Sequence, residues 1–128
     1  MNRRRGFFLC ALAAVAVWAC AQPEKEWFGL ADRAGNPVSS PVRARGELYA
    51  AYKTPRGTTD KIAFELYFKD EAGGWKLIFL NIQQSDTPAA LVREPLVVED
   101  LPPGAYKIVF IRNDKPIGET VFELLATE

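Results

Sequence analysis

The sequence contains no histidine and only two cysteines among its 128 residues. Histidine is the side chain whose ordinary pKa lies nearest neutral pH, and it is the commonest metal ligand. Its absence excludes a Ser-His-Asp triad, a Cys-His dyad and every zinc site that needs histidine. We therefore expect a protein that binds a partner and does not catalyse a reaction, with no cofactor and no metal site.

An excess of one charge is also lacking, because 16 Lys and Arg residues balance 16 Asp and Glu residues. Domains that bind nucleic acid carry a basic face, so this balance gives no indication of a nucleic-acid partner. Glycine-rich phosphate loops, Walker-type lysines and metal-spaced cysteine clusters do not occur. A small hydrolase that uses paired carboxylates is compatible with the residue types, but a chain of this size leaves little room for a deep cleft.

The N-terminal segment has the layout of a secretory signal. Arg3, Arg4 and Arg5 precede an apolar run that extends from Phe7 to Ala21. This run is shorter than the roughly 20 residues that a helix needs to cross a bilayer. A basic segment followed by a short apolar run is typical of a signal peptide, so we expect an N-terminal signal helix. An uncleaved membrane anchor is the alternative.

Two cleavage sites are compatible with this signal. Val17-Trp18-Ala19-Cys20 resembles a bacterial lipobox, and the resemblance implies that residues 1–19 are removed and that Cys20 is acylated. Ordinary cleavage after a small-x-small site would instead occur before Gln22. We favour lipidation, because Cys20 would otherwise be an unpaired thiol in an exported protein.

Lipoprotein processing changes the composition of the mature chain. It removes three arginines and leaves 13 basic and 16 acidic residues, a net charge of −3. Cys10 is discarded with the signal, so no intramolecular disulfide is available. We expect residues 20–26 to form a tether and residues 27–128 to form one domain. The expected location is the cell envelope, facing the periplasm or the outer surface, with the lipid anchor in the membrane.

The pattern of the remaining chain has a period of two residues, which is typical of β-strands. In residues 61–69, for example, apolar side chains alternate with side chains of the opposite face. Strands are predicted at 27–32, 47–53, 61–69, 75–82, 96–99, 106–112 and 115–125. About seven short strands separated by turn residues predict an all-β antiparallel sandwich. Residues 55–57 are predicted as a turn and residues 89–92 as a helical turn.

A resemblance to a known class of domain lies in the C-terminal third. Leu101-Pro-Pro-Gly-Ala-Tyr-Lys-Ile, Asn113-Asp-Lys-Pro-Ile-Gly and Val121-Phe-Glu-Leu resemble the closing hairpin of immunoglobulin-like domains in bacterial exported proteins, many of unassigned function. The resemblance implies a Greek-key immunoglobulin-like sandwich and places Tyr106 at a tyrosine corner, with its hydroxyl bonded back across the turn. Asn113-Asp114 tolerates positive φ and is predicted as the hairpin turn.

Several of the predicted strands are apolar on both faces. One face must fill the core, and the other would be an exposed patch of the kind that marks a partner site. We predict such a patch on one sheet, for an envelope protein whose identity the sequence does not give. Its predicted members are Ile78, Leu80, Val109, Ile111 and Val121. Alternatively, residues 85–95 or the N-terminal segment cover this face. The leading interpretation is a non-catalytic envelope lipoprotein that acts in protein binding or assembly.

Aromatic residues support a second interpretation. Trp75 and Tyr67 are candidates for stacking on a sugar, which would make the protein a freely secreted carbohydrate- or ligand-binding module. Core packing is the simpler explanation of these aromatics.

Charged residues near the predicted turns are weaker candidates. The pairs Asp70-Glu71 and Glu99-Asp100 have the oxygen ligands that calcium prefers, although solvated turns are the simpler explanation. Arg43 and Arg45 would suit an anion, but charges of this kind also protect exposed sheet edges.

Overall fold

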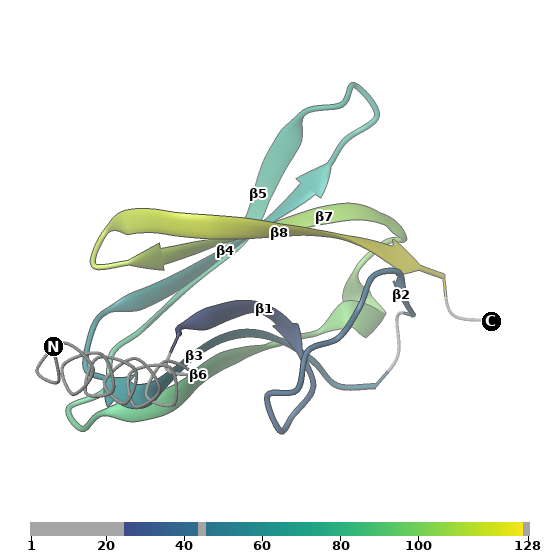
Figure 1. The fold of residues 1–128 in the computed structure, drawn as a ribbon. Helices are drawn as coiled ribbons and strands as arrows, with labels where there is room; N and C mark the ends of the chain where they lie inside the picture. The colour runs from purple at the N-terminus through teal and green to yellow at the C-terminus, as the bar shows by residue number, and fades with distance from the viewer. Residues whose placement is uncertain (1–24, 44–45, 127–128) are drawn as a thin grey trace, which may run out of the picture.

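Two β-sheets packed face to face make up the protein, as a computed structural model of residues 25–43 and 46–126 shows (Figure 1). The signal helix predicted for residues 1–19 and the lipidation site Cys20 lie outside these described residues. Within the described ranges, no helix is long and apolar enough to span a membrane.

The smaller sheet has three strands in the order β1-β3-β6, all antiparallel. Its strands are β1 (Trp27–Ala31), β3 (Leu48–Thr58) and β6 (Ala89–Leu96). The larger sheet has five strands in the order β2-β8-β7-β4-β5. Its strands are β2 (Val42–Arg43), β4 (Ile62–Lys69), β5 (Trp75–Gln83), β7 (Gly104–Arg112) and β8 (Lys115–Leu125). A short 3-10 helix, η1 (Val98–Asp100), connects β6 to β7.

The strand order identifies the fold. The chain crosses from one sheet to the other after β1, β2, β3, β5 and β6, while β4–β5 and β7–β8 are hairpins within one sheet. Strands A, B and E of an immunoglobulin domain share one sheet, and strands C, F and G share the other. β1, β3 and β6 correspond to the first set, and β4, β7 and β8 to the second. The predicted immunoglobulin-like Greek-key sandwich is therefore confirmed.

The core lies between the sheets because alternate side chains of each strand point inward. Phe64 and Phe110 meet edge to face, with ring centres 5.7 Å apart, and Tyr106 stacks on Phe122 at 5.5 Å. The other core residues are Leu30, Leu48, Ala50, Tyr52, Ile62, Leu66, Leu96, Val98, Ile108 and Leu124. All of them lie between residues 30 and 124, so this part of the chain contains a complete core of its own.

Two details of the predicted closing hairpin are confirmed. The Tyr106 hydroxyl donates a hydrogen bond to the Pro102 carbonyl oxygen, which is the predicted tyrosine corner. Burial raises the pKa of this phenol. Asn113 and Asp114 form the turn with φ values of 50° and 69°. Asn113 Oδ1 also accepts a hydrogen bond from the Lys61 amide at 3.0 Å, which fixes the turn against the start of β4.

Three local predictions are wrong. Residues 55–57 lie inside β3, where the pairing with β6 shifts register between Lys53 and Thr58. Residues 89–92 begin β6 instead of forming a helical turn, because they pair with β3 and this tertiary pairing outweighs local helix propensity. Residues 96–99 are not a separate strand, since they contain the end of β6 and part of η1.

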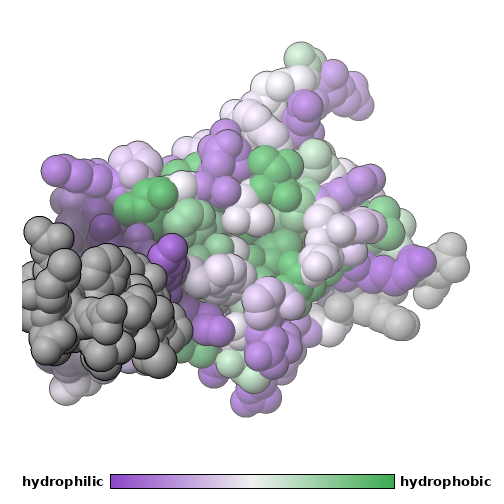
Figure 2. All heavy atoms as spheres, in the orientation of Figure 1, coloured by the Kyte–Doolittle hydropathy of each residue, from purple (hydrophilic) through white to green (hydrophobic). Residues whose placement is uncertain are grey.

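The β4–β5 hairpin extends beyond the rest of the sandwich (Figure 1). Figure 2 shows hydrophilic residues at its tip and hydrophobic surface along the junction between the two sheets on this side. β5 is a free edge of the larger sheet, and β6 is a free edge of the smaller one. Free edges of this kind are possible sites for strand pairing with a partner.

Candidate functional site

The outer face of the five-stranded sheet contains most of the predicted patch. Strand pairing aligns its side chains in rows that cross the sheet, because directly paired residues share a face. One row, at the middle of the strands, aligns Leu80, Glu65, Val109 and Glu119. The next row is wholly apolar, and it aligns Ile82, Ala63, Ile111 and Pro116.

Four of the five predicted patch residues lie together on this outer face. Leu80 and Val121 are 49% and 55% exposed, and Val109 and Ile111 are half-buried between them. Residues 85–95 do not cover them, because they cross to the smaller sheet and mostly form β6 there. The patch is thus open in the described part of the chain.

Ile78 does not belong to this face, and its placement there is wrong. Leu66 pairs with Phe79 and Tyr67 pairs with Leu77, so Ile78 is an extra residue in a β-bulge. A bulge shifts the alternation of side chains by one position. Ile78 instead lines a hollow between the sheets together with Leu66 and Phe79.

The same bulge brings Leu77 to the outer face, and Ile82, two residues beyond Leu80, shares this face by ordinary alternation although it was not among the predicted patch residues. Leu77 is 50% exposed and Ile82 is 56% exposed, and both belong to rows of the outer face. Strict alternation along β5 would place Leu77 on the face opposite Leu80, because the two residues are three positions apart. We use the name outer patch for the complete set, which is Leu77, Leu80, Ile82, Val109, Ile111 and Val121.

The predicted stacking residues Trp75 and Tyr67 lie at one corner of the outer face, and a lysine occupies the space beside both. The Lys107 Nζ atom lies 4.9 Å from the Trp75 ring centre and 5.1 Å from that of Tyr67. Lys69 Nζ lies 5.8 Å from the Trp75 ring as well. The Tyr67 hydroxyl donates to Glu65 at 2.9 Å, and this hydrogen bond raises the pKa of the phenol. Both rings therefore already have a lysine of this chain beside them.

The hollow beside Ile78, here called the junction hollow, lies between the free edges β5 and β6. It has a volume of about 350 Å³ and a mainly apolar lining. Burial raises the pKa of Glu94, the carboxyl group on its β6 side. Its lining residues are Leu66, Ile78, Phe79, Glu94, Pro95, Leu96, Val97, Asp100 and Leu101.

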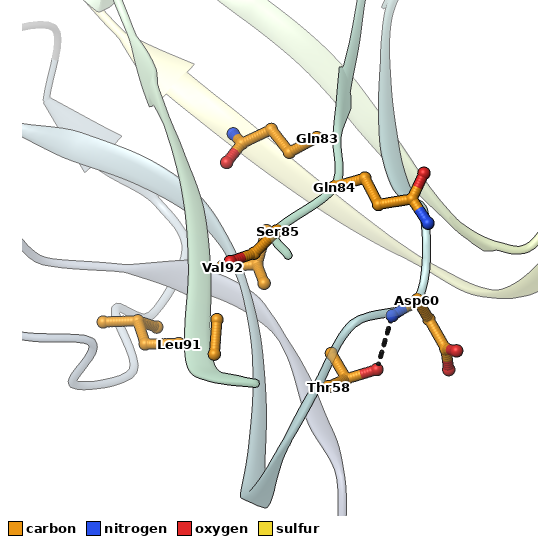
Figure 3. A pocket seen from close by; sticks show the side chains of 8 residues that line it. Thr58, Asp60, Gln83, Gln84, Ser85, Leu91 and Val92 are labelled. Carbon is orange, nitrogen blue, oxygen red and sulfur yellow. Dashed lines mark hydrogen bonds between the residues drawn. The ribbon is translucent and has the colours of Figure 1, made fainter. Parts of the chain in front are cut away.

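A smaller hollow of about 120 Å³ lies at the opposite end of the same two edges (Figure 3). Thr58, Asp60, Gln83 and Ser85 are among its polar lining residues, and the Asp60 amide donates to the Thr58 hydroxyl at 2.9 Å. Gln83 Nε2 also donates to the Arg93 carbonyl at 2.8 Å, which connects β5 to β6. These polar groups thus make hydrogen bonds within the chain.

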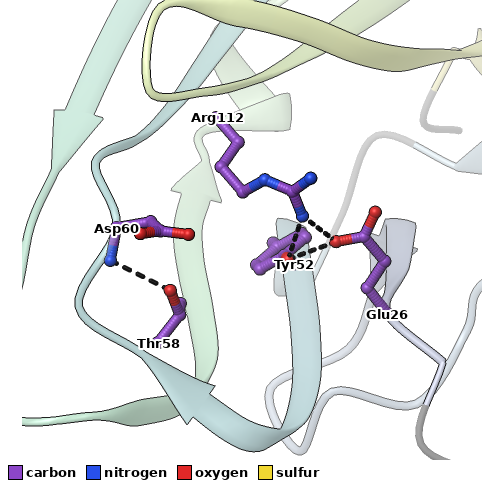
Figure 4. Close-up of polar contacts among 5 residues, drawn as sticks. All are labelled: Glu26, Tyr52, Thr58, Asp60 and Arg112. Atoms are coloured by element: carbon purple, nitrogen blue, oxygen red, sulfur yellow. Dashed lines mark hydrogen bonds and ion pairs between the residues drawn. The ribbon is translucent and has the colours of Figure 1, made fainter.

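A polar cluster connects the start of the domain to both sheets (Figure 4). The Tyr52 hydroxyl donates a hydrogen bond to Glu26, and Arg112 donates to both groups, at 3.1 Å to the Tyr52 oxygen. Burial raises the pKa of Tyr52, and the hydrogen bond to Tyr52 raises the pKa of Arg112. The cluster fixes the position at which the chain enters the sandwich.

The remaining charged residues considered for calcium or anion binding do not form a binding site in the described part of the chain. Asp70 Oδ1 accepts the Gly74 amide at 2.8 Å and closes the β4–β5 turn. The described residues contain no group of three or more Cys, Asp or Glu side chains suited to a metal ion. Arg43 is exposed on β2, and Arg45 lies outside the described residues.

Comparison with known proteins gives no assignment of function. No family model matches the sequence, and no curated protein matches it. An immunoglobulin-like protein from Pseudomonas aeruginosa is similar in structure, with 13% identity, a TM-score of 0.46, and coverage of 79% of this chain and 92% of that one. The DNA-bound alkylpurine DNA glycosylase AlkC of Pseudomonas fluorescens aligns at 12% identity and a TM-score of 0.42, covering 65% of this chain and 27% of that one. Similarity at this level says nothing about activity.

Proposed function

We propose that the protein is a non-catalytic lipoprotein of the cell envelope whose immunoglobulin-like domain binds another envelope protein through the outer patch. The observation that supports this is the exposure of several large aliphatic side chains on one sheet face. Leu77, Leu80, Ile82 and Val121 are 50%, 49%, 56% and 55% exposed, respectively. Exposed apolar patches on a protein surface mark interaction sites.

The composition of the outer patch favours a protein partner. Its apolar side chains are interspersed with charged ones: Glu65 pairs with both Leu80 and Val109, and Lys107 pairs with Val121 and lies 3.9 Å from Glu119. Protein–protein interfaces combine apolar contacts with polar and charged groups in this way. The sugar-binding alternative needs open aromatic faces, and Lys107 lies beside both Trp75 and Tyr67.

The partner site is tested by charge substitution in the native membrane. Leu80→Glu should weaken the complex with the envelope partner by about tenfold or more, because it replaces a large exposed apolar side chain with a carboxylate beside Glu65. Association is measured by native gel electrophoresis of gently solubilised membranes. Val97→Glu is the matched control, since Val97 is 62% exposed but lies at the junction hollow. Equal effects of the two substitutions, or none from Leu80→Glu, would contradict the proposal.

The anchor is tested separately by the intact mass of the protein recovered from membranes. A mass that lacks residues 1–19 and includes acyl chains supports lipidation of Cys20. A chain that begins at Gln22 would show ordinary secretion and contradict the anchor. This measurement does not depend on the outer patch, so the two parts of the proposal fail independently.

A further inference from the structure

A second surface lies at the end of the domain where the tether joins it. It is a shallow hollow of about 450 Å³ on the outer face of the three-stranded sheet, here called the tether hollow. Lys25, the first described residue, is part of its wall. The complete lining is Lys25, Trp27, Ala34, Lys53, Pro55, Ala90 and Leu91.

The lining of the tether hollow combines cations with apolar surface. Two lysines supply positive charge, and no acidic residue is among the lining residues. Lys53 Nζ donates to the Gly35 carbonyl at 3.0 Å and lies 5.6 Å from the Trp27 ring centre. An ammonium group has three donors, so donors remain for a ligand. This chemistry suits an anionic group attached to an apolar or glycerol body.

Trp27 is held flat along the sheet at this site. A Cβ atom on Gly29 would lie 2.9 Å from Cζ2 of Trp27, so the indole lies directly over the glycine. Lys53 pairs with Trp27 across the β1–β3 ladder and is positioned beside it. An indole at the boundary between a chain and a membrane typically lies at the level of the lipid head groups.

Charge is distributed unevenly between the two ends of the sandwich. The end that contains Glu26 and Arg112 is rich in basic residues, and the opposite end is rich in acidic ones. Glu26 and Asp114 pair with Arg112 and Lys61, respectively. The charged residues of the tether end are the basic Lys25, Lys53, Arg56, Lys61, Arg112 and Lys115 and the acidic Glu26, Asp60, Asp86 and Asp114. Those of the opposite end are the acidic Asp32, Glu47, Asp70, Glu71, Glu99, Asp100 and Glu123 and the basic Arg33, Arg43, Lys69 and Lys76.

The length of the tether then determines which end faces the membrane. From Cys20 to Lys25 the chain can extend at most about 18 Å. β8 alone has 11 residues, which corresponds to a length of about 36 Å. An acylated Cys20 therefore keeps the basic end within about 18 Å of the bilayer.

We propose that the tether hollow binds the head group of an anionic phospholipid in the membrane that holds the anchor, with Lys25 and Lys53 on the phosphate and Trp27 at the head-group level. The inference rests on the proposed acylation of Cys20. Bound in this way, the three-stranded sheet faces the membrane near its tether end, and the outer patch, on the opposite face of the sandwich, points away from the bilayer.

The test uses the lipidated protein reconstituted into vesicles. Lysine reactivity toward acetic anhydride is measured by mass spectrometry in vesicles of phosphatidylcholine alone and in vesicles that also contain phosphatidylglycerol. Lys25 and Lys53 should become about fivefold less reactive with the anionic lipid, as expected for about one basic contact each. Lys69 and Lys76, at the opposite end, serve as internal controls and should keep their reactivity. Gly29→Ala, which displaces the Trp27 ring without changing charge, should reduce the protection.

Several outcomes would overturn the inference. Equal reactivity of Lys25 and Lys53 in the two kinds of vesicle would show that no anionic head group is bound. Equal protection of all four lysines would show only general attraction to a charged surface. Protection by inorganic phosphate with phosphatidylcholine alone would assign the hollow to a soluble anion. If the intact mass shows no acyl chains, the proposed lipid anchor and this inference are both contradicted. An acylated protein with unprotected lysines overturns this inference alone.

Discussion

The ammonium nitrogen of Lys107 lies 4.9 Å from the centre of the Trp75 ring, and its side chain is only 17% exposed. The same nitrogen lies 5.1 Å from the Tyr67 ring and 3.9 Å from a carboxylate oxygen of Glu119. Lys107 thus connects β5, β4 and β8 across the outer face. The lysine holds the Trp75 and Tyr67 rings in place at this corner of the outer face. The part of the outer face that stays open to a partner is therefore the aliphatic outer patch.

Replacing Lys107 with alanine should therefore expose the Trp75 ring. We expect stronger quenching of tryptophan fluorescence by acrylamide, and a loss of about 0.5–1 kcal/mol of unfolding free energy from the missing cation–π contacts. The increase in quenching should disappear when Trp75 is also replaced by phenylalanine. Lys115→Ala, at an exposed position, is the control. Unchanged quenching in Lys107→Ala would show that the lysine does not cover the ring.

The tyrosine corner should contribute measurably to stability. Tyr106→Phe removes the hydroxyl that donates to the Pro102 carbonyl, with no change in the packing of the ring. We expect a loss of about 1 kcal/mol of unfolding free energy in urea titrations, the usual contribution of a protein hydrogen bond. Tyr49→Phe removes a hydroxyl whose bond to Glu47 is exposed, and it should change stability less. Equal losses in the two variants would argue against a special role for the corner.

Glu94 should make stability depend on pH. Burial raises the pKa of its carboxyl group above the ordinary value of 4.5, so the folded state binds this proton more tightly than the unfolded state does. The resulting stabilisation is complete below about pH 4.5 and is lost as the pH rises through the raised pKa. Glu94→Gln should therefore be more stable than the parent protein at pH 7 and equally stable at pH 3, as measured by urea unfolding.

A matched substitution separates burial from general charge effects. Glu47→Gln removes one carboxylate at an exposed position. It should not reproduce the gain in stability at pH 7. If Glu94→Gln is less stable than the parent at pH 7, the carboxylate makes favourable contacts that outweigh its burial.

The fold could be predicted from the sequence because its decisive signals are local. The alternation in residues 62–69, the turn at Asn113-Asp114 and the position of Tyr106 each depend on neighbouring residues, and all three are present in the structure. The helical turn predicted at residues 89–92 is wrong because these residues form a strand only through pairing with β3, which is remote in sequence. Local periodicity contains no information about a distant pairing strand.

The outer patch could be predicted only where strand alternation is regular, because a bulge is not visible in the sequence pattern. Val109 and Ile111 lie on β7, whose side chains alternate regularly, and Val121 lies on β8 beyond the register shift that the β7–β8 pairing makes between Phe110 and Ile111, so their outward direction follows from the sequence. Ile78 is the extra residue of the β5 bulge and Leu77 precedes it, and such an extra residue carries no clear sequence signal. The tether hollow was missed entirely, because it combines β1, β3 and β6 with a loop that folds over them.

The central claim, that the outer patch is the partner-binding surface, is tested most directly by photocrosslinking in living cells. A photoreactive phenylalanine analogue is placed at Leu80, which is 49% exposed, or at Val97, which is 62% exposed. We predict a discrete crosslinked adduct with one envelope protein from position 80 and none from position 97, and loss of the adduct when Ile82→Glu is added. No adduct from position 80, or the same adduct from both positions, would contradict the account.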